Sequence, residues 1–405
     1  MSNGTIDRRR AERVLAHIDR SAVARLAQEL VRIPTVNPPG DVREAARLCA
    51  AFLEDAGFTV EIDAADPTKP NVIARLGTGS PPVVLWNSHL DVVPVGAETA
   101  WTVPPFSGSI REGRLYGRGS CDVKGGVAAQ LVAAAALARS GLRLHGTLVV
   151  TEVADEEVGG QLGAQRIADR DDLRPDAVLV AEPTNNRIAI GERGGVGIRV
   201  TVHGRTAHGA LPWEGANAIE GMARVIVALQ EELWPRLAAR RHPSFAPASA
   251  TVSLIEGGVK TNVVPDRCSI FIDRRLIPNE SPETAVDEVR TVAERAIARV
   301  PGLRVSVEPA PEWPGRPAIL QPEDSHLVST MVAVNRFLGL ETQLTGFSMG
   351  TDGRFFAHRG YPTVIYGPGD PRLAHQPDEW VSIDELHQCA QAYAVAGLLL
   401  LGASE

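Results

Sequence analysis

Strand-like runs alternate with helix-like runs along much of the chain, and this alternation restricts its fold more than any other feature. Residues 147–153 and 177–180 are rich in branched apolar side chains, as in buried strands, while the alanine-rich residues 127–137 predict a buried helix. Such alternation is typical of a mostly parallel sheet covered by helices. The sequence therefore predicts an α/β domain. At 405 residues, 44% of them hydrophobic, the chain is long enough for a second core.

Periodicity and end signals place the other elements of this domain. One helix is expected to begin after Ser21, a residue suited to an N-cap, and to end before Pro34. Further helices are expected at residues 41–56, 160–168, 324–338 and 383–400, and strands at residues 58–62, 71–76, 83–86 and 363–366.

The character of the chain changes after Arg193. Residues 196–202 alternate apolar and polar side chains with period two, which predicts a strand with one covered face. Other strands are expected at residues 250–255, 268–272 and 304–307, and helices at residues 218–233 and 282–299. These proportions predict a small antiparallel α+β domain inserted into the larger one.

Polar residues lie where the strands of the larger domain are expected to end. The glycine-rich stretch Y-G-R-G-S-C-D-V-K-G-G places Asp122 between a strand and the helix at 127–137. Open α/β sheets hold their sites beyond the carboxyl ends of the strands. His89 and Asp91 in N-S-H-L-D-V-V-P share one face of an extended chain. Imidazole is a metal ligand, and a carboxylate on its other nitrogen would fix the tautomer.

More carboxylates and a second histidine follow other strand-like runs. Glu156 and Glu157 come after the strand at 147–153, and an extended chain would point them in opposite directions, so that one can bind metal while the other faces water. Glu182 in A-E-P-T follows the next strand, and His375 lies in A-H-Q-P-D-E. Two histidines and several carboxylates are the ligand set expected of a two-metal hydrolase.

With these five motifs in this order, the chain resembles the zinc metallopeptidase and aminoacylase family. Within it, the chain is most similar to the acetylornithine deacetylase and succinyl-diaminopimelate desuccinylase branch. The likeness spans nearly the whole sequence. It implies a catalytic domain formed by residues 1–193 and 310–405, and a lid and dimerisation domain at residues 194–309.

The resemblance also implies two metal sites and a general base. His89, Asp122 and Glu182 would bind one ion, and Glu157, Asp122 and His375 the other, with Asp122 as the bridge and a cis peptide between Asp122 and Val123. Mixed nitrogen and oxygen ligands without thiolate suit zinc, with cobalt or manganese able to substitute. Glu156 would be the general base, and Asp91 would support His89.

Other motifs match the family's substrate-binding positions. His208 in G-R-T-A-H-G-A-L-P resembles the lid histidine that contacts the substrate carbonyl oxygen, in dimeric relatives across the dimer interface. Asn262 in T-N-V-V-P-D and Arg275 in D-R-R-L-I-P match lid positions for the substrate's polar groups. The loop that contains Gly350 and Thr351 resembles the one that binds a substrate carboxylate. A homodimer through the lid is therefore expected.

The function that the resemblance implies is hydrolysis of the amide bond of an N-acyl amino acid, a small-molecule substrate. Glu182 favours a deacylase over an exopeptidase, since carboxypeptidase-like relatives often carry aspartate there. A dipeptidase or carboxypeptidase remains an alternative, as does an amidohydrolase or deaminase that acts on a small ring compound. A non-catalytic metal-binding relative is a further alternative, against which the intact Glu156 argues.

Charge and composition exclude some partners. The formal net charge of −8 argues against nucleic acid or an anionic membrane as a partner, because both require a basic surface. The four cysteines are widely spaced, without a C-x-x-C pair, which fits a reducing compartment. The N-terminal M-S-N-G-T-I-D-R-R-R continues into an amphipathic pattern, unlike a secretory signal, and no run approaches the length of a membrane span. We therefore expect a cytoplasmic protein.

Overall fold

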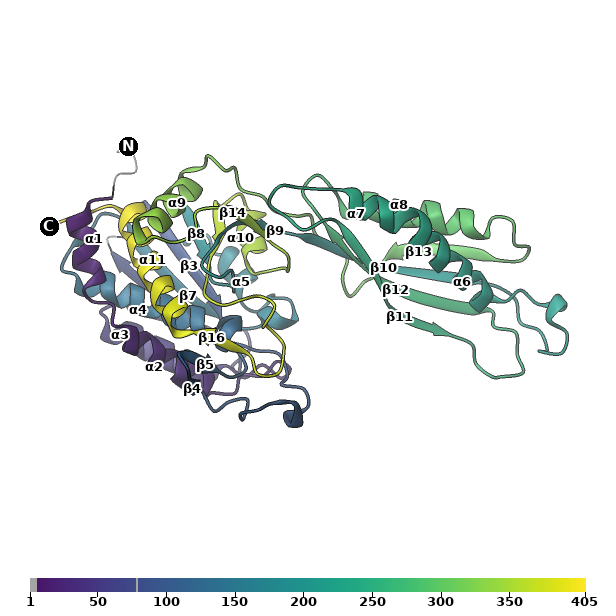
Figure 1. The fold of residues 1–405 in the computed structure, drawn as a ribbon, viewed down its shortest axis with the longest axis horizontal. Coiled ribbons are helices and arrows are strands. Elements are labelled where there is room, and N and C mark those ends of the chain that lie inside the picture. Colours follow the sequence, from purple (N-terminus) through teal and green to yellow (C-terminus); the bar gives the residue numbers. More distant parts are fainter. Residues whose placement is uncertain (1–5, 78) are drawn as a thin grey trace. The chain divides into compact units, whose positions relative to one another are not determined.

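The computed structural model describes residues 6–77 and 79–405, so the first half of the N-terminal stretch discussed above lies outside the described residues. The chain divides into two compact units. The first contains the residues up to Gly191 and those from Gln321 onward, and the second contains Glu192–Leu320. Figure 1 shows a helix-covered sheet in the first unit and a smaller sheet with helices in the second.

An eight-stranded sheet forms the centre of the first unit, in the order β1-β2-β7-β3-β8-β15-β9-β14. The four central strands, β7, β3, β8 and β15, are parallel to one another, while β1, β2 and β9 pair antiparallel on the two sides. This arrangement confirms the predicted α/β class with its mostly parallel centre. The strands are β1 Thr59–Asp63, β2 Asn71–Gly77, β3 Val83–His89, β7 Thr147–Val153, β8 Ala177–Val180, β9 Ile188–Glu192, β14 Leu344–Phe347 and β15 Thr363–Ile365.

Helices cover both faces of this sheet. Successive side chains of a strand point to opposite faces, and each face belongs to a different hydrophobic core. Trp86 and Val150 belong to the larger core, whereas Leu85 and Val149 belong to the smaller one. The larger core packs against α1 Arg8–Leu15, α2 Arg20–Val31, α3 Arg43–Asp55, α4 Gly125–Arg139, α9 His326–Leu338 and α11 Ile383–Leu401. The smaller core packs against α5 Ala164–Ala168 and α10 Gly353–Ala357.

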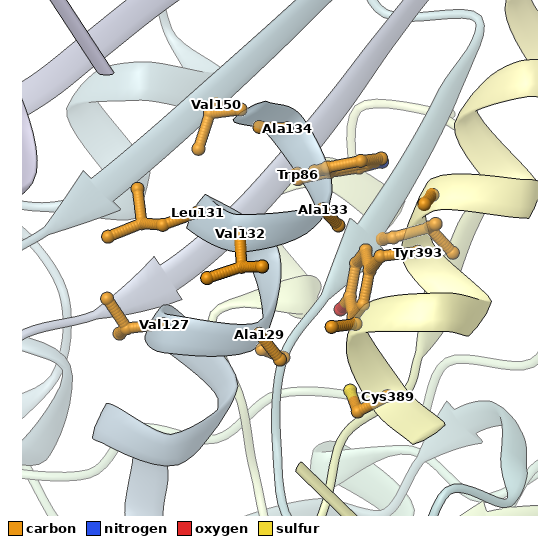
Figure 2. Close-up of a cluster of buried hydrophobic side chains, with 14 of the residues drawn as sticks. Trp86, Val127, Ala129, Leu131, Val132, Ala133, Ala134, Val150, Cys389 and Tyr393 are labelled. Atoms are coloured by element: carbon orange, nitrogen blue, oxygen red, sulfur yellow. The ribbon is translucent and has the colours of Figure 1, made fainter. Parts of the chain in front are cut away.

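Helix α4 is the central helix of the larger core. Figure 2 shows its apolar side chains between the sheet and α11, with Trp86 and Tyr393 close to one another. Their ring centroids lie 5.1 Å apart in an edge-to-face arrangement. By length and composition alone Ser120–Arg139 could span a membrane, but the backbone is non-helical at Asp122 and Val123, and 89% of the apolar window is buried inside the protein. Its apolar character follows from burial in the core.

Several short elements were not predicted, because their sequences are too brief to show a period. These are the strands β4 Ser109–Arg111, β5 Arg114–Tyr116, β6 Arg143–Leu144, β16 Trp380–Ser382 and β17 Ala403–Ser404, and the single turns Glu98–Ala100, Glu156–Val158 and Pro212–Glu214. The helix expected at residues 160–168 begins only at Ala164, since the residues before it form turns.

The second unit is an antiparallel sheet with helices against it. Its strands β10 Gly194–His203, β11 Ser249–Gly257, β12 Arg267–Leu276 and β13 Arg304–Pro309 lie in the order β11-β12-β10-β13. The helices are α6 Ala218–Ala228, which continues through the wider turn Leu229–Leu233 into α7 Trp234–Ala239, and α8 Pro282–Ile297. Residues 310–320, placed beyond the insert by the sequence, cluster with this unit. The N–H groups of Gly195 and Gly197 donate to the carbonyl oxygens of Arg316 and Trp313.

Candidate active site

The central parallel strands of the first unit bring the predicted ligands to one edge of the sheet. His89 is the last residue of β3, Glu156 and Glu157 follow β7, Glu182 follows β8, and His375 lies on the chain after β15 (Figure 1). Parallel strands present their carboxyl ends at the same edge, where α/β proteins build their sites. The topology therefore explains how residues far apart in sequence come close together.

Asp122 lies between two groups of potential ligands. His89, Asp122 and Glu182 form one group, and Asp122, Glu157 and His375 form the other; within each group the ligand atoms all lie within 4.8 Å of one another. The two oxygens of Asp122 face different histidines, since His89 Nε2 lies 3.2 Å from Oδ1 and His375 Nε2 lies 3.3 Å from Oδ2. The shared carboxylate is therefore arranged to serve both groups.

The backbone around Asp122 is irregular and is held by a buried ion pair. Glu379 Oε1 accepts hydrogen bonds from the N–H groups of Cys121 and Asp122, at 2.9 and 3.0 Å. Its other oxygen lies 2.5 Å from Arg118 Nη1. The Asp122–Val123 peptide is cis, as the resemblance implied. Sequence reasoning missed Glu379, although it lies in the same A-H-Q-P-D-E motif as His375.

Asp91 lies beside His89, but its backbone oxygen is closer to the ring than its carboxylate is. The nitrogen His89 Nδ1 lies 2.9 Å from the backbone oxygen of Asp91, and 3.8 Å from its carboxylate. That carboxylate accepts hydrogen bonds from the N–H groups of Glu156 and Glu157, both at 3.2 Å, and from Asn37 Nδ2 at 2.8 Å. The Asp91 carboxylate is therefore closer to the turn after β7 than to the His89 ring.

Glu156 and Glu157 lie in a single helical turn, so the prediction of an extended backbone there was wrong. The preceding Asp155 has φ 76°, which ends the strand and starts the turn Glu156–Val158. Glu157 Oε2 lies 3.3 Å from His375 Nε2. Glu156 belongs to neither group of ligands, and its Oε1 lies 3.8 Å from Arg354 Nη1. The two carboxylates therefore still have different neighbours.

The charges of this site fit a divalent cation. Burial raises the pKa of Glu157 to about 7 and also raises the pKa values of Glu156 and Glu182. Asp122 is buried too, but its hydrogen bonds to His375 and His89 hold its pKa below the usual range. Hydrogen bonds with Asp122, and next with Glu157, raise the pKa of His375 to about 10.

One oxygen of this site has no protein partner. Glu157 Oε1 is buried and makes no hydrogen bond within residues 6–77 and 79–405. Buried carboxylates are stable as anions only when cations or donors compensate them. Two histidines and two glutamates around one shared aspartate are the donor chemistry of a dinuclear site for borderline divalent ions.

The predicted substrate residues fall in both units. His208, Asn262 and Arg275 belong to the second unit, where the N–H of Gly209 donates to the carbonyl oxygen of Asn262 at 2.8 Å. Arg275 is paired with Asp273 through Nε at 2.8 Å and lies over the Trp313 ring.

The predicted carboxylate-binding loop belongs to the first unit. Thr351 is buried, and its Oγ1 accepts a hydrogen bond from the N–H of Gly353 at 2.9 Å, while Gly350 is partly exposed. That N–H is therefore already engaged within the loop.

Comparisons with known proteins identify relatives over most of the chain. The model of the Peptidase family M20/M25/M40 matches residues 85–396. The succinyl-diaminopimelate desuccinylase of Methylobacterium radiotolerans is 32% identical over 386 residues, which cover 92% of this chain and 95% of that protein. The N-formyl-4-amino-5-aminomethyl-2-methylpyrimidine deformylase of Halalkalibacterium halodurans is 32% identical over 407 aligned positions, covering 93% and 94% of the two chains.

A solved structure shares the fold. It is the Bacillus subtilis YXEP protein, described as a dinuclear metal binding peptidase from the M20 family, with a TM-score of 0.70 and 18% identity over 95% of this chain and 99% of that one. The match to the family model extends from β3, which ends in His89, through the motif of His375 and into α11. The chain therefore belongs to peptidase family M20/M25/M40.

Proposed function

We propose that this protein is a dinuclear metal-dependent hydrolase that cleaves the linear amide bond of an N-acyl amino acid. The observation that carries the proposal is the pair of ligand groups that share Asp122, with Glu156 beside them but in neither group. The relatives named as a desuccinylase and a deformylase support it, since both names describe removal of an acyl group from nitrogen.

His89, Asp122 and Glu182 would hold one ion, and Glu157, Asp122 and His375 the other. The donor set contains nitrogen and carboxylate oxygen without thiolate, which favours zinc, with cobalt or manganese able to substitute. When bound, such a pair supplies Lewis acidity, which lowers the pKa of water and polarises a carbonyl.

Glu156 is the proposed general base. Its carboxylate takes a proton from the attacking water as the oxygen bonds to the acyl carbon, and returns a proton to the amide nitrogen as the carbon–nitrogen bond breaks. The products are a carboxylic acid and an amine. Asp91 acts at a distance from the reacting atoms. Its carboxylate accepts hydrogen bonds from the N–H groups of Glu156 and Glu157 and so fixes the turn that carries them.

The proposed substrate-binding residues are His208, Asn262, Arg275 and the loop of Gly350 and Thr351. Arg275 offers a guanidinium suited to a carboxylate, and His208 offers a ring nitrogen to the acyl oxygen. We also propose a homodimer through the second unit, whose edge strand β11 exposes Leu254 and Ile255. The four buried cysteines are free thiols, a state that a reducing compartment such as the cytoplasm maintains.

A second candidate function is removal of a formyl group from the amino group of a small ring compound. The deformylase relative favours it, because it is as similar to this chain as the desuccinylase. The two functions share the hydrolytic centre and differ in whether the substrate needs a free α-carboxylate.

A substrate screen with metal-loaded protein tests the proposal. N-acetyl, N-succinyl and N-formyl amino acids are incubated with protein loaded with zinc or cobalt, and amine release is measured. We expect hydrolysis of at least one acyl amino acid, with a loss of about 10²- to 10⁴-fold in Glu156→Gln at unchanged metal content. Hydrolysis of dipeptides alone, or equal rates on an acid and its amide, would contradict the N-acyl amino acid assignment.

A further inference from the structure

The guanidinium of Arg354 joins the loop before α10 to the turn that carries Glu156. Its Nη1 donates to the carbonyl oxygen of Thr351 at 2.5 Å, and its Nη2 donates to that of Gly159 at 2.8 Å. Nη1 also lies 3.8 Å from Glu156 Oε1. The Arg354 guanidinium therefore contacts the loop before α10, the turn after β7 and the carboxylate of Glu156.

The turn is pressed against the start of α10. Gly159 and Gly160 both have positive φ, at 123° and 73°. A Cβ added at Gly160 would lie 2.7 Å from Asp352 Oδ1 and 2.8 Å from the Phe355 ring, closer than real contacts allow. Because no side chain fits between these segments, the position of the Glu156 turn depends on the segment that contains Arg354.

Arg354 is poorly suited to receive the substrate's carboxylate. Its residue is only 7% exposed, and one face of its guanidinium lies 4.4 Å from the centre of the Phe355 ring. Two backbone oxygens already engage its planar fork, which a lysine ammonium could not reproduce with the same geometry.

We propose that Arg354 is a positioning residue that holds the Glu156 carboxylate in place for hydrolysis. The inference rests on the proposed function, in which Glu156 is the base. In this role Arg354 acts through Glu156, while other groups recognise the substrate. A displacement of about 1 Å in a reacting group can cost about 10²-fold in rate, so loss of this contact is expected to be large in kcat.

The kinetic test compares Arg354→Met and Arg354→Lys with wild type, on an acyl amino acid and on its amide. We expect kcat to fall about 10- to 100-fold in both variants, with KM changed less than about 3-fold, and by the same factor on acid and amide. In a Glu156→Gln background, Arg354→Met should have little further effect, because the group it positions is gone. Arg359→Met is the matched control, since Arg359 is on the same segment and donates to Phe355.

A second measurement does not depend on activity. Amide hydrogen exchange of the metal-free protein should be faster in residues 155–163 of Arg354→Met, with exchange in β7 unchanged. A selective loss on the acid substrate, with raised KM and unchanged kcat, would make Arg354 a substrate receptor and overturn the proposal. So would an undiminished effect in the Glu156→Gln background, or unchanged exchange in the turn.

The outcomes separate this inference from the proposed function. A wild-type protein that hydrolyses no amide defeats the proposed function, and the base-positioning role with it. If wild type is active and Glu156→Gln is not, the proposed function stands, and Arg354→Met with wild-type kcat then overturns the positioning role alone.

Discussion

Glu379 binds the backbone of Asp122 directly, with its Oε1 3.0 Å from the Asp122 nitrogen. The residue shared by the two candidate ligand groups is thus held by a carboxylate that belongs to neither group. Glu379 is fully buried, and Arg118, itself 2% exposed, balances its charge. This pair connects the Asp122 loop to the segment that carries His375.

Glu379→Gln is expected to weaken metal binding at the site by about 10- to 100-fold, as loss of a residue that orients ligands does. The amide keeps an acceptor but leaves the buried Arg118 without its counter-charge. Competition with a chelator measures the affinity. The control is Glu341→Gln, an exposed glutamate that also accepts two backbone N–H groups. Equal affinities in both variants would contradict the role of Glu379.

Glu157→Gln should lose one ion of the pair before the other. Glu157 occurs only in the group with His375, so its loss leaves His89, Asp122 and Glu182 intact. After dialysis against a weak chelator, elemental analysis should find close to one ion per chain, against two in wild type and in Glu156→Gln. Full metal occupancy in Glu157→Gln, or loss of metal in Glu156→Gln, would make Glu156 the ligand and Glu157 the base.

The sequence brought out the candidate ligands more readily than the residues that position them. His89, Glu182 and the pair after β7 could be found because each follows a strand-like run, and a parallel sheet gathers such positions. The contacts of Asp91, Arg354 and Glu379 could not be found, because each joins segments that are distant in sequence. A single residue of unusual φ, Asp155, was enough to turn an expected extended segment into a helical turn.

The same holds for the fold. The buried helix α4 was predicted from its length and alanine content, and the strands β7 and β8 were predicted from short runs rich in branched apolar side chains. The short strands β4, β5 and β16 form a separate three-stranded sheet, whose pairing depends on tertiary contacts that no local pattern records.

The hydrogen bonds around Glu152 lead us to expect a neutral carboxyl group in the folded protein. Ser88 Oγ lies 2.5 Å from Glu152 Oε2 and 3.0 Å from Gln130 Oε1, while Gln130 Nε2 donates to the Asn87 oxygen. The hydroxyl has one hydrogen, so it can donate to Gln130 only if a protonated Glu152 donates to it. Burial raises the pKa of Glu152 well above its usual value in agreement with this network.

A raised carboxyl pKa costs stability as pH rises. Above about pH 4.5 the unfolded chain releases the Glu152 proton and the folded protein keeps it, so the free energy of unfolding falls by up to about 1.4 kcal/mol per pH unit until the folded pKa is reached. Glu152→Gln keeps a donor for Ser88 and removes this dependence. In urea unfolding between pH 5 and 7, the free energy of unfolding of Glu152→Gln should increase relative to that of wild type as pH rises.

A glutamate with the opposite shift provides the control for this measurement. Arg170, and then Arg75, lower the pKa of Glu61 although its partial burial opposes them. Glu61 therefore stabilises the fold above the unfolded pKa, and this contribution is lost as pH falls. Between pH 5 and 7, Glu61→Gln should therefore be less stable than wild type by a constant amount, and this difference should shrink only below the unfolded pKa of about 4.5. A pH-independent difference between Glu152→Gln and wild type would show that Glu152 is ionised in the fold.

Gly397 lets α11 approach α4 closely. A Cβ added there would lie 2.7 Å from Leu137 Cδ1 and 3.0 Å from the Trp86 ring, in the cluster of Figure 2. Gly397→Ala should therefore lower the free energy of unfolding by about 1 to 3 kcal/mol, despite the better helix propensity of alanine. Gln391→Ala, on a partly exposed position of the same helix, should change it by less than about 0.5 kcal/mol. Chemical denaturation compares the two, and a stabilised Gly397→Ala would contradict the close packing.

The last prediction concerns the edge strand of the second unit. β11 is at the edge of its sheet, and Leu254 and Ile255 on it are 63% and 58% exposed. Exposed apolar edge strands are templates for pairing with another chain, and most soluble homo-oligomers are two-fold dimers. Leu254→Lys should shift the protein from dimer to monomer in sedimentation velocity. Ile62→Lys, at a 51% exposed position on the edge strand β1 of the first unit, should leave the dimer intact.

In such a dimer we expect His208 to act in the partner's active site, as the sequence resemblance implied. The test mixes two inactive variants, Glu156→Gln and His208→Ala, under conditions that allow subunit exchange. A mixed dimer then holds one complete site, with the base from one chain and the histidine from the other, and it should recover up to half of the activity per dimer. A histidine that stabilises a developing oxyanion contributes about 3 to 4 kcal/mol, so the recovery would be far above background. A verified mixed dimer without activity would confine His208 to its own chain or remove it from the mechanism.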